Sequence, residues 1–386
     1  MAGTVAKAVG SSLRMWNTDK NLAWTLGTNY TTVGTEFETY VNKYLFPKLQ
    51  ETKLINIALG NRFNFLAKET PYVGQLNEEY AIMDSVPVDL NLDKNATLML
   101  ERNYPKMATK LYGPGVHRKQ KFTLNDNDNR LNWQNLADAI AYAVAVYQKK
   151  ISDINVSEEM EIRAMLVDYS ENVMNAANKR IATDVDDMSN QIYETIFNLQ
   201  NNSWKYNEAN TASGGAVGRY TTTTKLQDIY ILTTDHVKNY ILNTRLANTF
   251  QAAGIDLLDH VMSFDDLGGS FKTSADVTLK QADVDYIRAY GDYQAAVGDV
   301  IPAGVVFTFD ITGAPSFAGK ATEIKPSSDL YALVMDINSI YYKRNTAKLL
   351  PTYFYNNELD EYNYWIHYYS FKSISPFFNK ILIEGK

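Results

Sequence analysis

The sequence predicts an α+β protein built around a helical centre, and three observations support this prediction. Residues 131–200 hold three successive sets of apolar side chains spaced three and four positions apart, which is the period of an amphipathic helix. Short, polar, turn-rich segments with strand-like patterning lie on both sides of this centre. The chain then ends in an apolar strand and an aromatic run.

Each predicted helix of the centre has its own apolar face. The three faces are Trp133, Leu136, Ile140, Val144 and Tyr147, then Ile162, Leu166, Tyr169, Val173 and Ala176, then Val185, Met188, Ile192, Ile196 and Leu199. Ser157 is the predicted N-cap of the second helix, and the acidic residues that follow it suit the positive end of a helix. We therefore expect a spine helix over about 157–180, with Leu166 and Tyr169 as packing anchors.

Composition excludes several classes of protein. A chain of 386 residues is long enough for two or three subdomains, and its 45% hydrophobic content is that of a globular protein. It has no cysteine, which excludes disulfides, thiolate metal sites and cysteine nucleophiles. Residues 1–10 lack the apolar core of a secretory signal, and the longest apolar run, 139–147, is far shorter than the ~20 residues that span a bilayer. We expect a soluble protein with no membrane partner.

The segments before the helical centre are polar and interrupted by turns. Residues 1–35 predict an extended arm, and residues 36–66 are partly helical. Between 70 and 125 we expect a long two-faced hairpin with a tight reversal at residues 113–115. Its strand-like runs lie around Leu76–Met83, Leu98–Glu101, Met107–Tyr112 and Gln120–Leu124. None of these runs is apolar enough to form a core, so the hairpin must pack on something else.

The second half of the chain begins with a strand-then-helix unit. Leu226–Leu232 predicts a strand, and Thr234 or Asp235 caps the helix that follows. The unit repeats weakly at 256–264. Residues 268–328 are rich in Gly, Thr, Asp and Val, which predicts a small β-rich insertion with a turn at 301–304.

The final segment combines an apolar strand, Leu330–Met335, with the aromatic run 362–369. Tyr364 and Trp365 are predicted packing anchors, because Tyr and Trp bury large areas while keeping a polar tip. Stacking on nucleic-acid bases is an alternative, but it needs interleaved basic residues. The nearby candidates are few: Lys343, Arg344, Lys348 and Lys372. Packing is therefore the favoured interpretation.

A search for an active site finds no recognised motif. The glycines at 214, 215 and 218 lack the Lys-Ser/Thr pair of a phosphate-binding loop. The run 126–129 resembles a calcium loop, but Arg130 occupies a ligand position and no glycine follows at the sixth. The histidines, His117, His236, His260 and His367, show no metal-ligand spacing. We therefore predict no catalytic residue, no metal and no cofactor, and a protein that is not an enzyme.

Motifs in a fixed order give the clearest indication of function. They are Gly74 with Glu78-Glu79-Tyr80, Glu101-Arg102-Asn103-Tyr104-Pro105, Met165-Leu166-Val167-Asp168-Tyr169, Leu226-Gln227-Asp228, Leu333-Val334-Met335-Asp336, Tyr364-Trp365-Ile366-His367 and Phe377-Phe378. In this succession the chain resembles the major capsid proteins of tailed bacteriophages, which have the HK97-type fold. It is most similar to those of small short-tailed phages of Gram-positive hosts, the phi29-like group.

The resemblance implies a domain plan. Residues 1–69 would form the N-terminal arm and first helix, and residues 70–125 an extended loop (E-loop) that clasps a neighbouring subunit. Residues 126–202 and 330–386 would form the peripheral domain with the spine helix. Residues 203–329 would form the axial domain, including the insertion at about 268–328. The short N-terminal region leaves no room for a large built-in scaffolding domain.

The resemblance also implies a function in assembly. Copies of the chain would form hexamers and pentamers in an icosahedral or prolate head, assembled in the host cytoplasm with a separate scaffolding protein and a portal protein. The formal net charge of −7 fits a shell that encloses double-stranded DNA without sequence-specific binding. Glu78, Glu79, Glu101 and Arg102 are candidates for contacts between subunits. Three alternatives remain open: a tail or host-binding component that uses 268–328, an encapsulin-like compartment shell and, more remotely, a hydrolase.

Overall fold

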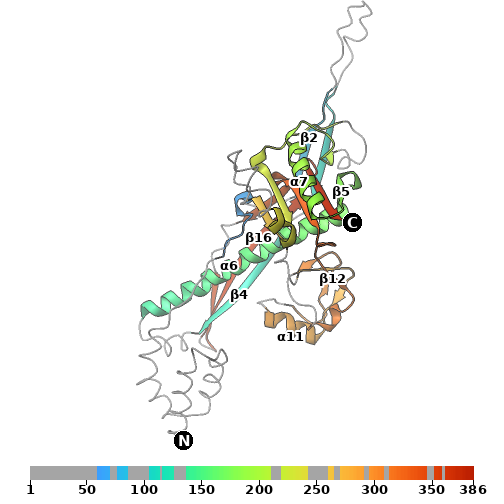
Figure 1. Cartoon of the computed structure of the whole chain (residues 1–386). Coiled ribbons are helices and arrows are strands. Elements are labelled where there is room, and N and C mark those ends of the chain that lie inside the picture. Colours follow the sequence, from blue (N-terminus) through green and yellow to red (C-terminus); the bar gives the residue numbers. More distant parts are fainter. Residues whose placement is uncertain are drawn as a thin grey trace, which may run out of the picture. The chain divides into compact units, whose positions relative to one another are not determined.

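The computed structural model divides the chain into two units, Met1–Ile57 and Ala58–Lys386, and the described residues all belong to the second. The described residues are 59–69, 76–85, 104–113, 115–125, 136–209, 219–241, 260–264, 270–290, 295–307, 313–345, 352–358 and 361–386. The predicted arm at 1–35, most of the segment 36–66, the Leu98–Glu101 run and the glycines at 214–218 lie outside them. Strands and helices mix along the chain, as expected for an α+β fold (Figure 1).

A five-stranded mixed sheet forms the centre of the core. Its order is β5 (Lys179–Ala182), β17 (Lys380–Gly385), β13 (Tyr331–Asp336), β6 (Ile229–Thr233) and β7 (Val261–Ser263). All six residues of β13 are buried, because helices cover both faces of this central strand. The predicted apolar strand at 330–335 is therefore confirmed.

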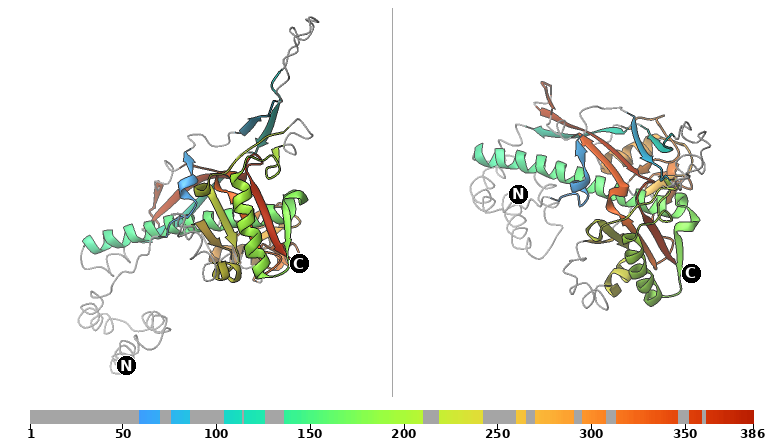
Figure 2. Two further views of the ribbon diagram at one scale, coloured as in Figure 1. Left: turned by 45° about the horizontal axis from the view of Figure 1, so that its top comes forward. Right: turned by 90° about the horizontal axis from the view of Figure 1, so that it is seen from above.

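Helix α7 (Val185–Gln200) and helix α9 (Asp235–Ile241) cover one face of this sheet (Figure 2). The predicted apolar positions of α7 are buried at Met188, Ile192, Ile196 and Leu199. The Asp184 side chain accepts a hydrogen bond from the backbone N–H of Asp187 at 2.8 Å and caps the helix. Strand β6 followed by α9 confirms the predicted strand-then-helix unit, but Leu226–Asp228 forms a 3-10 helix rather than the start of the strand. Strand β7, within the predicted repeat, pairs parallel with β6.

Helix α6 (Leu136–Asp168) packs against the other face and runs without a break for 33 residues. The prediction of two separate helices here, with Ser157 as an N-cap, is therefore wrong. The segment contains neither Gly nor Pro, so nothing in the backbone stops the helix. The acidic residues after Ser157 serve another purpose, because Glu158 is fully buried and paired with Arg344.

The spine ends earlier than residue 180. A π-helical turn at Tyr169–Val173 follows α6, and the Met174 N–H closes it on the Tyr169 carbonyl at 2.8 Å. A short 3-10 helix at Ala176–Asn178 then leads into β5. The helix ends here, and the residues that follow form β5, an edge strand of the sheet.

The segment expected to be one long hairpin is divided between two sheets. Strands β2 (Asn77–Ile82) and β3 (Met107–Tyr112) pair antiparallel, with Asn77 opposite Tyr112 and Ile82 opposite Met107. Strand β4 (Val116–Asn125) pairs instead with β16 (Glu361–Ile374). Residues 113–115 thus connect two sheets rather than turning one strand back on the other. The two-stranded ribbon β2–β3 is called the arm below.

The aromatic run lies in β16, the centre of a second sheet. One edge of β16 pairs with β14 (Ile340–Asn345) and β15 (Thr352–Asn356), and the other edge pairs with β4. A short strand, β1 (Lys68–Glu69), continues the sheet beside β14. Side chains of Ile366 and Tyr368 pack with Ile154 of α6, so this sheet lies along the spine helix.

The insertion has a small core of its own. It contains β8 (Phe271–Thr273), β9 (Val277–Thr278), β10 (Val300–Ile301), β11 (Val306–Phe307) and β12 (Ala321–Glu323). It also contains helix α11 (Gln281–Tyr290), so the region is not purely β-rich. Its apolar centre includes Val277, Val284 and Phe317. Gly304 has φ +85° and forms the predicted turn before β11, since only glycine adopts this conformation readily.

Candidate assembly surfaces

The arm has two unlike faces, because successive side chains of a strand alternate in direction. The inner face carries Ala81 and Ala108, which are buried at 6% and 0% exposure. The outer face carries large apolar side chains that are mostly exposed. Their exposed fractions are 69% for Tyr80, 59% for Ile82, 55% for Met107 and 64% for Leu111. Leu76, directly before β2, is also exposed, at 63%. A patch of this kind is typical of an interaction surface.

Contacts at its base hold the arm to the rest of the subunit. Ala81, Met83 and Ala108 pack with Phe377 and Ala209. The backbone N–H of Asp84 donates to the Arg219 carbonyl at 2.7 Å, and the Thr221 hydroxyl donates to the Asp84 carboxylate at 2.6 Å. Lys343 of β14 donates to the Asn77 side chain at 2.6 Å. The base of the arm is therefore fixed while its outer face stays uncovered.

Two of the four predicted contact residues lie on the arm, and they lie on opposite faces. Glu78 is exposed on the outer face, opposite Leu111. Glu79 is half-buried on the inner face, where its carboxylate accepts a hydrogen bond from the Tyr112 hydroxyl at 2.7 Å. Burial and then the Glu79 carboxylate raise the pKa of Tyr112. Glu101 and Arg102 lie outside the described residues.

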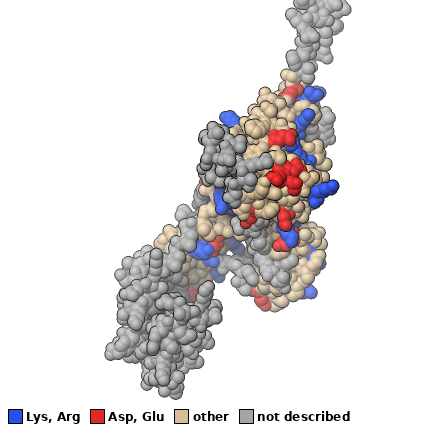
Figure 3. Space-filling model, in the orientation of Figure 1, with Lys and Arg blue, Asp and Glu red and all other residues tan. Residues whose placement is uncertain are grey.

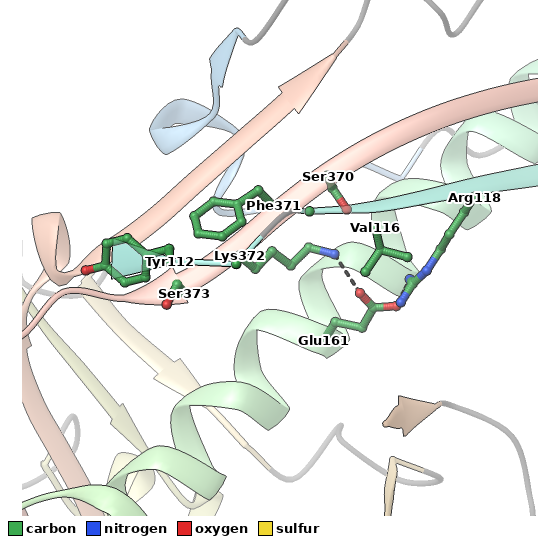
Figure 4. A pocket seen from close by; sticks show the side chains of 10 residues that line it. Tyr112, Val116, Arg118, Glu161, Ser370, Phe371, Lys372 and Ser373 are labelled. Atoms are coloured by element: carbon green, nitrogen blue, oxygen red, sulfur yellow. Dashed lines mark hydrogen bonds and ion pairs between the residues drawn. The ribbon is translucent and has the colours of Figure 1, made fainter. Parts of the chain in front are cut away.

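A pocket of about 330 Å³ opens beside the base of the arm (Figure 4). Lys372 of β16 and Arg118 of β4 both point to Glu161 of α6, and the Lys372 ammonium lies 2.6 Å from the carboxylate. Burial alone would raise the pKa of Glu161, but the two cations outweigh burial and hold the pKa below its usual value. The charged groups of the pocket are thus paired with one another.

Two buried ion pairs join distant parts of the chain, the first between α6 and β14 and the second between β17 and the segment after α7. Glu158 of α6 pairs with Arg344 at 3.2 Å and accepts a hydrogen bond from the Tyr342 hydroxyl at 2.8 Å. At the start of β17, Lys380 lies 3.6 Å from Glu208 and donates to the Ser375 carbonyl at 2.7 Å. Burial lowers the pKa of Lys380 from 10.5 to about 8.

Three of the four residues predicted as packing anchors pack in apolar clusters, and Trp365 lies on the other face of its sheet. Leu166 is 1% exposed in the main core, and the partly buried Tyr169 packs against it and donates to Glu208. Tyr364 stacks on Phe122 with ring centroids 5.0 Å apart. Trp365 faces the opposite side of the sheet, where Lys121 Nζ lies 5.8 Å from its ring centroid.

The structure also brings together two histidines that looked unrelated in the sequence. The rings of His117 and His367 lie 5.4 Å apart on β4 and β16. In the part of the chain that the structure describes, no group of three His, Cys, Asp or Glu side chains could hold a metal ion. Within the same part, no helix is long and apolar enough to cross a bilayer.

Surface charge is mixed on the face shown in Figure 3. Acidic side chains gather over α7, whose first turn contains Asp186 and Asp187, and Lys and Arg side chains are scattered around them. Tight binding of duplex DNA rests on many clustered cations. Charge on this described surface therefore fits assembly better than gripping of DNA.

The sequence matches the Phi29-like phage major capsid protein family over residues 6–384. The chain belongs to this family. The major capsid protein of Staphylococcus phage 44AHJD is 60% identical over 383 residues, covering 99% of this chain and 94% of that protein. The major capsid protein of Staphylococcus phage S24-1 is 59% identical over the same length, covering 99% and 95%.

Solved structures agree with this assignment. A chain from the capsid structure of Staphylococcus phage Andhra superposes with a TM-score of 0.84 at 60% identity, covering 92% of this chain and 91% of that one. A chain from a structure of native bacteriophage P68 gives a TM-score of 0.77 at 62% identity, covering 91% and 92%. The HK97-type α+β capsid fold predicted from the sequence is confirmed.

This capsid protein is thus a structural component of the virion shell of a tailed phage. The family match decides for a capsid protein over the tail component and the compartment shell that the sequence alone left open.

Proposed function

We propose that copies of this capsid protein form hexamers and pentamers of a closed head, and that the arm holds each copy to its neighbour. The observation that supports this is the exposed apolar outer face of the arm, led by Tyr80 and Ile82. A two-stranded ribbon with exposed apolar residues is marginal by itself in water. It gains stability when a neighbouring surface covers those side chains, at roughly 1.5–3 kcal/mol for each large one.

The mechanism is association rather than catalysis. Each copy in a symmetric shell is held by several neighbours at once, so modest pairwise contacts add to a stable assembly. We infer a separate scaffolding protein and a portal protein as partners, in keeping with the head assembly that the family implies. The net charge of −7 supports enclosure of double-stranded DNA without a tight grip.

The domain plan follows from this role with one change of boundary. We infer that 70–112 acts as the extended loop, and that β4 belongs with β16 in the peripheral domain because the two strands pair over ten residues from Val116 to Asn125. Residues 203–329 would meet their copies at the centre of a capsomer.

The test is a double substitution on the outer face, Tyr80→Lys with Ile82→Lys. Subunits should keep the wild-type circular dichroism spectrum and thermal unfolding temperature, since both side chains are exposed, and electron microscopy should show no closed shells. The matched control is Phe197→Lys in α7, because Phe197 is 58% exposed and Ile82 59%. Wild-type yields of shells from the double variant, with or without a scaffold, would rule out the arm as the connecting element.

A further inference from the structure

The insertion is joined to the end of the spine helix near both of its own ends. Near its start, the Lys272 ammonium lies 2.6 Å from the carboxylate of Asp168, the last residue of α6. At its end, the backbone N–H of Ser327 donates to the Glu171 carboxylate at 2.6 Å. The part of the insertion between these contacts has a small core of its own. A shift of the insertion therefore acts first on residues 168–175, which we call the spine end.

The spine end departs from regular α-helical hydrogen bonding. Its π turn bonds the Met174 N–H to the Tyr169 carbonyl at 2.8 Å, whereas an α turn would use the carbonyl of Ser170. Exchange of one carbonyl for the other moves the residues that follow without unfolding the rest of the helix. Single π turns are frequent at functional sites of helices. The spine end therefore has two hydrogen-bonding patterns within reach, and coupling between distant sites requires such a two-state element.

Glu208 connects the spine end to the part of the subunit that carries the arm. Its carboxylate accepts hydrogen bonds from the Tyr169 hydroxyl and, at 2.8 Å, from the Asn175 backbone N–H. Glu208 is buried, and its own backbone N–H donates to the Pro376 carbonyl at 2.8 Å. The same carboxylate lies 3.6 Å from the Lys380 ammonium. Glu208 is therefore held from two sides, by the spine end and by the segment between β16 and β17.

The base of the arm packs on the residues beside Glu208. Ala209 follows Glu208 directly in the chain, and it forms one apolar cluster with Phe377 and with Ala81 and Ala108 of the arm. A movement of Glu208 therefore reaches the base of the arm through one further residue. Polar and apolar contacts thus run in an unbroken series from the insertion, through the spine end, to the arm.

We propose that the spine end couples the insertion to the arm, so that the contact between Lys272 and Asp168 sets how firmly the base of the arm is held. A ligand or neighbour that displaces the insertion then loosens or tightens the arm from a distance. The use of this coupling in assembly rests on the proposed function of the arm. The coupling itself is a property of the single subunit and is measured there.

The competing interpretation is that Lys272 only anchors the insertion. A partly exposed ion pair contributes little to the stability of a whole subunit, so its loss would then affect the insertion and the spine end alone. Coupling through a two-state element instead changes sites that do not touch the altered contact. The two interpretations therefore differ in what happens at the base of the arm.

Hydrogen exchange of the isolated full-length subunit tests the coupling. Lys272→Met should raise the exchange rates of the Met83 and Asp84 amides by about threefold or more, because their N–H groups exchange only when the bonds at the base of the arm open. Lys272→Arg should keep the wild-type rates. The matched control is Lys320→Met, since Lys320 is an exposed lysine that donates to the Asp276 carbonyl within the insertion, and the arm should be unaffected. Unchanged exchange at Met83 and Asp84 in Lys272→Met overturns the proposal.

A second substitution tests the path of the coupling. Tyr169→Phe removes the hydroxyl that bonds to Glu208 and keeps the ring that packs against the core. If the spine end carries the coupling, Lys272→Met should change exchange at the arm less in the Tyr169→Phe background than in the wild-type background, so the two effects are not additive. Additive effects would exclude the contact between Tyr169 and Glu208 from the path and overturn the proposal.

Outcomes separate this inference from the proposed function. If Tyr80→Lys with Ile82→Lys abolishes shells while Lys272→Met leaves exchange at the arm unchanged, the arm connects subunits but is not coupled to the insertion. If Lys272→Met speeds exchange at the arm while the double variant still forms shells, the coupling stands and the proposed function of the arm fails.

Discussion

Strand β13 and the arm contain similar side chains and use them in opposite ways. All six residues of β13 are buried between layers of the same chain, whereas Tyr80, Ile82 and Leu111 of the arm remain exposed. Apolar area buried within one subunit stabilises its fold, and apolar area left exposed becomes available to a neighbour. The difference separates the residues that decide folding from those that decide assembly.

A charge in the core should have the largest effect. Leu166→Asp places a carboxylate at a site that is 1% exposed, so we expect a loss of more than about 5 kcal/mol, comparable with the whole free energy of unfolding. Soluble subunits and shells should disappear together, and a charge at Tyr169 should act similarly. Tyr80→Asp on the arm should leave thermal unfolding unchanged. If Leu166→Asp subunits unfold at the wild-type temperature, the contrast between the two regions is wrong.

Breaking the buried pair between the spine and β14 should have the next largest effect. Arg344→Met removes the nearer of two cations beside the fully buried Glu158, and Lys372 remains 4.0 Å from its carboxylate. Breaking a buried pair typically costs about 3–5 kcal/mol. Urea unfolding of the subunit measures the loss. Glu158→Gln with Arg344→Met removes both charges and should recover part of it. A double variant as unstable as the single one would contradict this account.

The buried lysine of β17 should make stability depend on pH in the alkaline range. Because burial lowers the pKa of Lys380 from 10.5 to about 8, the unfolded chain binds this proton more tightly than the native subunit between these values. The cost of burying the charged form is fully present below pH 8 and falls as the pH rises toward 10.5. We therefore expect the free energy of unfolding to gain on the order of 1–3 kcal/mol from this group.

Lys380→Met isolates that contribution. The difference in free energy of unfolding between wild type and variant should change between pH 7.5 and pH 9.5, with wild type gaining relative to the variant. Parallel stability profiles for the two proteins would show that Lys380 keeps an ordinary pKa.

The smallest effect on folding is expected at the base of the arm. Glu79→Ala removes the hydrogen bond from Tyr112, which should cost only about 1 kcal/mol in the subunit. The yield of shells should fall by more than a loss of about 1 kcal/mol in subunit stability would cause. The reason is that the arm loses a hydrogen bond that holds its two strands in position. Arg102→Ala remains a parallel prediction from the sequence. Unfolding of either variant at a much lower temperature would place these residues with the core.

The sequence by itself determined the elements whose signals are local. The helical period defines α7, the unbroken apolar run defines β13, and the strand-like runs at 76–83 and 107–112 define the arm. The order of the motifs was enough to predict the capsid family, and the lack of cysteine and of a recognised active-site motif directed attention to assembly.

Only the tertiary structure decided which distant residues become partners. Ser157 has the local character of a helix start, yet α6 continues through it because Arg344 and Tyr342 satisfy the Glu158 that follows. Strand β4 shows the same limit, since its pattern could not distinguish pairing with β3 from pairing with β16. The period of the apolar residues indicates which side of a helix or strand is buried, whereas long-range packing determines which residues cover that side. The shared face of Trp365 and Lys121 therefore became visible only when β4 and β16 were paired.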